Sequence, residues 1–195
     1  EDIYSGAGGP VYFPGSADIE RANVTALQRE MGLDSYAELF AWSVREREAF
    51  WARTIARLGI RFRRPYERLV DLSRGIETPE WFIGAKMNIA ESCFQADPEQ
   101  AAIVFQREGG ELERMSYGAL QTLCNRVAGG LVAAGLAPGD RIAVDMPMTA
   151  ESVAIYLGII KAGCAVVAIA DSFAAPEIAT RLRIGSAQAV FTQDV

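Results

Sequence analysis

Residues 138–169 read PGDRIAVDMPMTAESVAIYLGIIKAGCAVVAI, and their pattern sets the architecture of the chain. A turn precedes a β-prone run at 141–145, and Thr149 is placed to cap a helix that is apolar on nearly every side. Gly163 ends this helix, and residues 165–169 form a second apolar run. Two strands joined by a helix and short connections predict parallel pairing with a right-handed crossover. Because the apolar runs are continuous, we predict a sheet that is covered on both faces.

The same alternation of strands and helices precedes this stretch. Residues 101–106 and 112–115 flank a turn at Gly109, which predicts a hairpin. Ser116 is placed to cap a helix whose apolar residues recur at positions i, i+3, i+4 and i+7, and Gly135 ends it. These residues therefore predict a hairpin followed by a helix with one buried face.

The alternation also continues after the stretch. Pro176 is suited to the first turn of a helix that ends at Gly185, and residues 188–192 form a last strand. We therefore predict an α/β fold with a doubly wound, mostly parallel sheet. A sheet of this kind normally continues beyond such a strand, so we expect the chain to be an incomplete fragment of a larger domain.

Three regions are predicted along the chain. Residues 1–20 are rich in Gly and Pro and predict a flexible arm. Residues 21–96 lack the regular alternation and predict a helical and irregular N-terminal extension. Residues 97–195 form the truncated α/β subdomain.

The extension is expected to contain capped helices and buried aromatic residues. Ser35 is placed to cap one helix, and Ser43 with Glu46 forms the Ser-x-x-Glu pattern of a capping box that opens the next. We expect Trp51 and Trp81 to be substantially buried and to fasten the extension to the α/β region.

The composition excludes several classes of function. The formal net charge is −6 and the basic residues are mixed with acidic ones, so we predict no nucleic acid partner. No apolar run reaches the roughly 18 residues that span a bilayer, so we predict no membrane partner. The chain has no histidine, which excludes a Ser-His or Cys-His nucleophile pair within it.

The three cysteines lie far apart and form no CxxC motif, so we predict no disulfide scaffold. Cys124 and Cys164 stand among apolar residues and are expected to be buried. A reduced, cytoplasmic compartment follows as the expectation, and an organellar address in sequence outside the chain is left open.

Six short motifs follow one another in the stretch from about Phe50 to Asp194. They are Phe50-Trp51 with the later Phe62 and Pro65-Tyr66, Trp81 to Asn88 (WFIGAKMN), Met115 to Leu120 (MSYGAL), Pro138 to Glu151, Lys161 to Ala165 (KAGCA), and Ser172 to Ala175 (SFAA). In this order they resemble motifs of the adenylate-forming superfamily, in particular those of AMP-forming acyl-CoA synthetases of the acetyl-CoA synthetase type.

This resemblance implies an acid-CoA ligase that uses ATP, Mg²⁺ and CoA. Such an enzyme activates a carboxylic acid as an acyl-adenylate and transfers the acyl group to CoA. The phosphate loop of the family (T-S-G-T-T-G-x-P-K-G), its Y-x-x-T-E segment and its C-terminal catalytic Lys are absent from the 195 residues. We therefore assign no catalytic residue and no metal ligand, and we expect this fragment alone to be inactive.

The resemblance also implies a site on the CoA side of the parent enzyme. Ser172 and Phe173 stand where the family has G-F-S-A, after the strand at 165–169 and at the carboxyl edge of a parallel sheet, where ligands collect. Asp171 stands where the family has glycine, and its carboxylate is expected to repel the phosphates of CoA.

Two alternatives from other classes stay open at this point. One is a non-catalytic interaction module that retains the synthetase fold. The other is a fragment of a Rossmann-type oxidoreductase, although no strand of this chain leads into a G-x-G-x-x-G motif with an acidic residue about twenty positions later.

Overall fold

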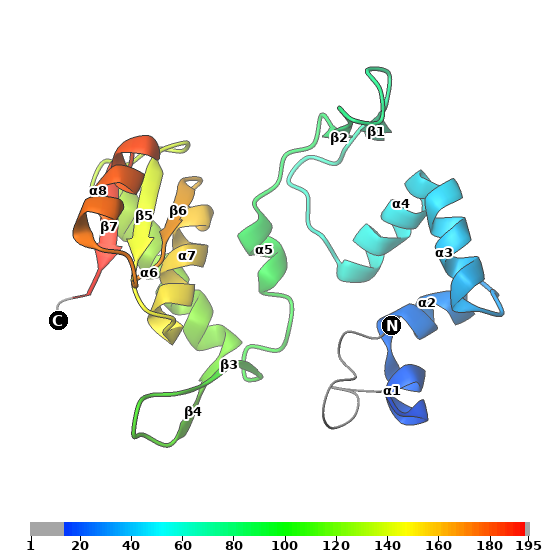
Figure 1. Ribbon diagram of the computed structural model, residues 1–195, viewed down its shortest axis with the longest axis horizontal. Coiled ribbons are helices and arrows are strands. Elements are labelled where there is room, and N and C mark those ends of the chain that lie inside the picture. The colour runs from blue at the N-terminus through cyan, green and yellow to red at the C-terminus, as the bar shows by residue number, and fades with distance from the viewer. Residues whose placement is uncertain (1–13, 194–195) are drawn as a thin grey trace. The chain divides into compact units, whose positions relative to one another are not determined.

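The structure is a computed structural model that describes residues 14–193, and these group into two compact units that divide between Arg57 and Leu58 (Figure 1). Most of the predicted arm over residues 1–20 lies outside the described residues. Residues 16–20 of this arm belong to the short helix α1 (Ser16–Arg21). The division at residue 57 falls inside the extension that we predicted over residues 21–96.

The first unit is helical throughout its described part. Its helices are α1, α2 (Asn23–Glu30), α3 (Tyr36–Arg45) and α4 (Arg47–Leu58). The predicted cap at Ser35 is confirmed, because its hydroxyl accepts a hydrogen bond from the backbone N–H of Glu38 (3.2 Å). The predicted cap at Ser43 is wrong. Ser43 lies inside α3, and its hydroxyl donates to the carbonyl of Phe40 (2.8 Å), so it does not cap α4.

The expectation that Trp51 and Trp81 are substantially buried is wrong. Trp51 is 39% exposed and Trp81 is 37% exposed. The Trp51 ring meets the Phe50 ring edge-on, with the centroids 5.4 Å apart, on the surface of α4. Trp81 lies in a two-stranded hairpin, and two strands alone do not enclose a side chain on both faces.

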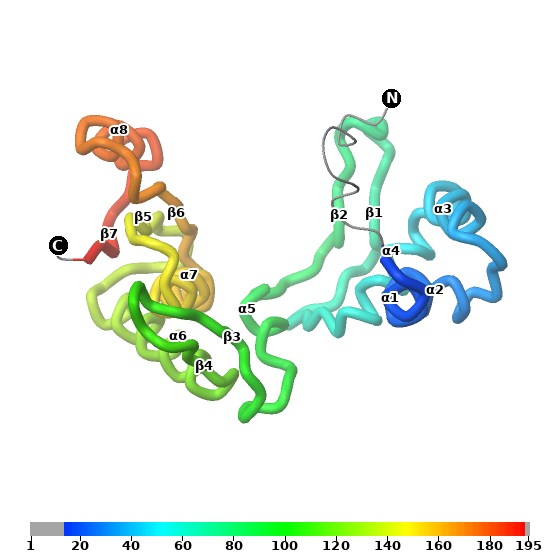
Figure 2. Tube along the Cα trace, turned by 60° about the horizontal axis from the view of Figure 1, so that its bottom comes forward, coloured from blue at the N-terminus to red at the C-terminus, as the bar shows by residue number. Residues whose placement is uncertain are grey.

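The second unit begins with a hairpin that the sequence did not predict. Strands β1 (Arg68–Asp71) and β2 (Glu80–Ile83) lie side by side in Figure 2 and pair antiparallel. Val70 is opposite Trp81. The short helix α5 (Ile89–Cys93) follows. The β1–β2 hairpin is therefore regular structure that the prediction of a helical and irregular extension over residues 21–96 did not include, whereas α5 agrees with the helical part of that prediction.

The predicted hairpin and helix before residue 138 are both present. Strands β3 (Ala101–Gln106) and β4 (Leu112–Ser116) pair antiparallel across a turn in which Gly109 has φ +69°. Helix α6 (Tyr117–Ala133) follows, and the Ser116 hydroxyl accepts a hydrogen bond from the backbone N–H of Ala119 (3.2 Å) as its N-cap.

Within residues 14–193 the parallel sheet has three strands in the order β6-β5-β7. The strands are β5 (Arg141–Asp145), β6 (Ala165–Ile169) and β7 (Ala189–Thr192), and the connecting helices are α7 (Ala150–Lys161) and α8 (Ala175–Ile184). Helix α7 links β5 to β6, and α8 leads from β6 back across β5 to β7 (Figure 1). The predicted α/β fold with N-terminal helices is therefore present, and the parallel sheet of the described residues is small.

Helices cover both faces of the sheet. Val166 of β6 packs against the core cluster that α6 and α7 form with β5. The next residue, Val167, faces the opposite side, where a Cβ added to Gly185 at the end of α8 would lie 3.0 Å from it. This alternation follows from the period of two along a strand.

The core lies where α6 and α7 cross over β5. Ile142, Ile159 and Cys124 are fully buried there, and Cys164 is 7% exposed. The predicted burial of Cys124 and Cys164 is therefore confirmed, and burial raises the pKa of both thiols. None of the helices between residues 14 and 193 has both the length and the apolar content that crossing a bilayer requires.

Candidate functional site

The candidate site is the carboxyl edge of the parallel sheet, where β5, β6 and β7 all end. Because the strands are parallel, the loops that follow them meet at this one edge, and α/β proteins bind ligands there. Three segments reach it: residues 146–149 after β5, residues 170–174 after β6, and Gln193 after β7.

The loop after β6 contains the predicted residues Ser172 and Phe173. It is a tight turn, closed by a hydrogen bond from the backbone N–H of Phe173 to the carbonyl of Ala170 (3.1 Å). Asp171 and Ser172 are exposed, and within residues 14–193 neither side chain makes a hydrogen bond. The structure therefore places both predicted residues at the carboxyl edge and leaves the Asp171 carboxylate and the Ser172 hydroxyl open to solvent.

Arg181 joins this loop, although nothing in the sequence analysis pointed to it. Its Cζ atom lies 3.6 Å from the centroid of the Phe173 ring, which is the geometry of a close cation–π contact. The only available signal was that Arg181 follows Phe173 by eight residues on a predicted helix. That spacing does not predict a contact, because Phe173 lies in a loop before the helix begins.

An apolar cavity of about 380 Å³ adjoins the same edge between β5, β6 and α7. It is lined by Val144, Met146, Met148, Ser152, Val153, Tyr156, Leu157, Ala168 and Ile169. Ser152 offers no binding group, because its hydroxyl donates to the carbonyl of Thr149 (2.8 Å) and accepts from the Thr149 N–H (3.0 Å). The cavity is therefore suited to an apolar group.

A second cavity, of about 420 Å³, lies beside β5 and β7 and is polar. It is lined by Phe105, Gln106, Arg107, Glu108, Pro147, Met148, Thr149, Ala150, Glu151 and Gln193. The Arg107 guanidinium already pairs with Glu151 (3.3 Å) and with Glu113 (3.6 Å). The Thr149 hydroxyl accepts the backbone N–H of Ser152 (3.1 Å) as the cap of α7. The Arg107 guanidinium and the Thr149 hydroxyl, which line this cavity, therefore already have partners within the fold.

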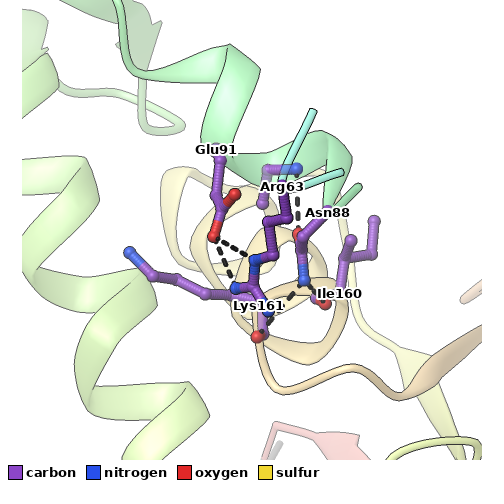
Figure 3. A network of polar contacts seen from close by, with 6 residues as sticks. Arg63, Asn88, Glu91, Ile160 and Lys161 are labelled. Atoms are coloured by element: carbon purple, nitrogen blue, oxygen red, sulfur yellow. Dashed lines mark hydrogen bonds and ion pairs between the residues drawn. The ribbon is translucent and has the colours of Figure 1, made fainter. Parts of the chain in front are cut away.

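The WFIGAKMN motif contributes a structural contact rather than a reactive group. The Asn88 side chain donates from Nδ2 to the carbonyl of Ile160 (2.7 Å) and accepts at Oδ1 from the backbone N–H of Ala90 (3.1 Å) (Figure 3). It therefore satisfies the first turn of α5 and a terminal carbonyl of α7 at the same time. Asn88 links the segment before α5 to the end of the buried helix.

An ion pair lies beside this contact. The Arg63 Nε donates to Glu91 Oε1 (3.0 Å), and this hydrogen bond is the main reason why the pKa of Glu91 is lowered (Figure 3). A carboxylate with a lowered folded-state pKa favours the folded state above its unfolded pKa. That contribution is lost as the pH falls through the folded pKa.

Replacing Asn88 with alanine is expected to lower the free energy of unfolding by about 2 kcal/mol, because the α5 cap and a hydrogen bond to α7 are both lost. Urea unfolding followed by circular dichroism measures this change. Asn125→Ala is the matched control, since Asn125 is exposed within α6. Equal unfolding midpoints for the two variants would contradict the role given to Asn88.

Neither the edge nor the rest of the described chain assembles a metal centre. Between residues 14 and 193, no three His, Cys, Asp or Glu side chains come together in a group that could hold a metal ion. The edge therefore offers an exposed turn with Asp171 and Ser172, a stacked arginine, and two cavities of opposite character.

Comparison with known families matches two consecutive parts of the chain. Residues 36–93 match the family described as acetyl-coenzyme A synthetase N-terminus, and residues 90–195 match the family described as AMP-binding enzyme. The second match covers more than half of the chain and includes the whole parallel sheet of the described residues.

Individual proteins resemble the chain over nearly its whole length. Probable acyl-activating enzyme 18, peroxisomal, of Arabidopsis thaliana is 36% identical, over 96% of this chain and 28% of that protein. An acetyl-coenzyme A synthetase of Ralstonia nicotianae is 29% identical, over 94% of this chain and 27% of that protein. The acetoacetyl-CoA synthetase from Streptomyces lividans superposes with a TM-score of 0.84 at 26% identity, over 95% of this chain and 30% of that chain. The chain thus spans 27–30% of the length of these relatives.

Proposed function

The chain belongs to the family of AMP-binding enzymes, and we propose that it is the amino-terminal part of an ATP-dependent acid-CoA ligase. The observation that carries this proposal is the order of the two family matches. A segment like the N-terminus of acetyl-coenzyme A synthetase leads directly into an AMP-binding segment. The fold similarity to an acetoacetyl-CoA synthetase supports the same assignment.

The proposed ligase works in two steps. The carboxylate oxygen of an acid attacks the α-phosphorus of ATP, pyrophosphate leaves, and an acyl-adenylate forms. The thiol of CoA, after losing its proton, then attacks the acyl carbon, AMP leaves, and a thioester forms. Between residues 14 and 193, no three or more His, Cys, Asp or Glu side chains form a group that could hold a metal ion, so we assign the Mg²⁺ that accompanies ATP to no residue of this chain.

Within that ligase, this chain supplies structure and one side of the CoA site. The strands β5, β6 and β7 belong to a doubly wound sheet, and the loop with Ser172 and Phe173 lies near the adenine end of CoA. Asp171 is exposed on that loop, which supports the prediction that its carboxylate weakens the binding of CoA phosphates. The apolar cavity lies beside the same edge.

The names of the relatives bear on the choice of acid and on the compartment of the enzyme. The names of the relatives include acetyl-CoA and acetoacetyl-CoA synthetases, so we propose a carboxylic acid as the substrate without specifying its chain length. The Arabidopsis relative is named peroxisomal, whereas the cysteine pattern of this chain predicts a cytoplasmic protein. Localisation of the tagged full-length protein in its native cells distinguishes the two.

The proposal is tested on the full-length protein expressed from its gene. With a panel of short and medium carboxylic acids, ATP, Mg²⁺ and CoA, we expect equal amounts of AMP and acyl-CoA to form for at least one acid. Omitting CoA should leave acid-dependent exchange between ATP and pyrophosphate. If no acid supports either reaction, the non-catalytic interaction module becomes the better reading. The family match already argues against a Rossmann-type oxidoreductase.

A further inference from the structure

The parallel sheet is covered unevenly on the side of α8. Ala143 of β5 lies opposite Val167 of β6 and opposite Val190 of β7, and residues that lie opposite one another in neighbouring strands share a face of the sheet. This face is the one that α8 covers, because a Cβ added to Gly185 would lie 3.0 Å from Val167. Ala143 is fully buried there, whereas Val190 is 47% exposed. The cover of this face therefore ends before β7.

The other face of β7 and its outer edge complete this picture. Ala189 and Phe191, the neighbours of Val190, point to the opposite face and pack against the core cluster of α6, α7 and β5. Within residues 14–193, β7 pairs with β5 alone, so the backbone groups along its outer edge have no strand partner. An apolar side chain without cover beside an unpaired edge is typical of a strand that lies inside a larger sheet.

The handedness of the crossovers decides which kind of element fits over Val190. The connection from β5 to β6 places α7 on one face of the sheet, and the connection from β6 to β7, which runs in the opposite direction, places α8 on the other. A strand added at the outer edge of β7 continues in the direction from β6 to β7. A right-handed connection to that strand must therefore place its helix on the α8 face, over β7.

We propose that, in the full-length protein, the segment after residue 195 forms a helix that packs on Val190 beside α8 and leads to a parallel strand at the outer edge of β7. This inference rests on the proposed function, because the chain spans 27–30% of the length of its relatives and the ligase therefore has further sequence. A connection between parallel strands takes a dozen or more residues, and a whole strand-helix-strand unit takes about 30. The helix that covers Val190 thus lies within about 30 residues after residue 195.

The experiment compares the rate of maleimide labelling in the full-length protein and in samples of the 195-residue chain that unfold cooperatively in urea. Val190→Cys places a thiol on the uncovered face of β7, and Thr180→Cys, the control, places one at an exposed position of α8. Mass spectrometry of the peptide that contains each new thiol separates its labelling from that of the natural cysteines. From the 195-residue chain to the full-length protein, labelling of Val190→Cys should slow at least about 30-fold, and labelling of Thr180→Cys should change by less than about threefold.

A photo-cross-link identifies the segment that covers Val190. With p-benzoylphenylalanine in place of Val190, the full-length protein should form a cross-link within the same chain, to a peptide from about the first 30 residues after residue 195. A cross-link to a second copy or to a more distant segment, or no cross-link to this peptide, would overturn the inference. Labelling of Val190→Cys that stays within threefold, or that slows only as much as labelling of Thr180→Cys, would overturn it as well. Neither measurement depends on catalysis, so absence of thioester formation by the wild type would overturn the proposed function alone.

Discussion

Gly158→Val is expected to lower the free energy of unfolding of the second unit by about 3 kcal/mol or more. Gly158 lies in α7 where this helix crosses α6. A Cβ added at this position would lie 2.6 Å from the Cβ of Val127 and 3.0 Å from the carbonyl oxygen of Cys124. Neither atom is the end of a flexible side chain, so α6 and α7 must separate to admit the new side chain.

The consequences extend beyond the two helices. Val127 packs against the cluster around Ile142 and Ile159, and Cys124 belongs to the neighbouring cluster with Leu120 and Ala154. Moving α6 away from α7 therefore disturbs both clusters, which contain most of the fully buried volume of this unit. We therefore expect Gly158→Val to disrupt the packing of both clusters rather than to cause a local adjustment.

Gly130→Val provides the matched control. Gly130 is an exposed helical glycine of α6, and a Cβ added there would meet no atom within 4 Å. Since valine and glycine differ little in helix propensity, this variant should change the free energy of unfolding by less than about 0.5 kcal/mol. Chemical denaturation of both variants measures the difference, and coincident curves would mean that α6 and α7 do not approach each other this closely.

The alternating strands and helices were predictable because capping residues and glycines in the sequence mark where they begin and end. Thr149 caps α7 through the predicted hydroxyl, and Gly163 follows this helix with φ +83°, a value that favours glycine. Short connections between such boundaries leave few ways to pair β5, β6 and β7. The close approach at Gly158 was not predicted, because a single glycine in an apolar helix does not reveal which side chain it faces.

The errors of prediction arose where local pattern and tertiary structure disagree. Ser43 and Glu46 have the spacing of a capping box, yet α3 continues past Ser43. The Ser43 hydroxyl therefore donates to the carbonyl of Phe40 within α3 instead of capping α4. The β1–β2 hairpin was missed because each strand has four residues and no hairpin turn of the common two-residue kind. Within it, Phe82 has φ +53°, a conformation that an aromatic residue rarely adopts and that no sequence pattern indicated.

The candidate site was predictable only in part. The position of Ser172 and Phe173 at the carboxyl edge follows from the order of strands and helices, because a loop after a parallel strand must lie there. The contact with Arg181 and the two cavities depend on how side chains pack across elements, and the sequence carries no local signal for this.

The 195-residue chain alone is expected to catalyse no acid-dependent exchange between ATP and pyrophosphate. Formation of an acyl-adenylate requires groups that hold the phosphates of ATP and stabilise charge as pyrophosphate leaves. The phosphate-loop motif of the family, T-S-G-T-T-G-x-P-K-G, is absent from the sequence, and residues 14–193 contain no metal-binding cluster. Radiolabelled pyrophosphate incorporation into ATP should therefore equal that of a protein-free mixture, whereas the full-length protein should exceed it by at least about 1,000-fold.

A folded sample is needed for this result to have meaning. Cooperative urea unfolding of the same preparation serves as the control, since a misfolded chain would be inactive for an unrelated reason. Exchange that scales with the concentration of the purified chain would contradict the prediction. It would mean that residues of this chain bind and activate ATP.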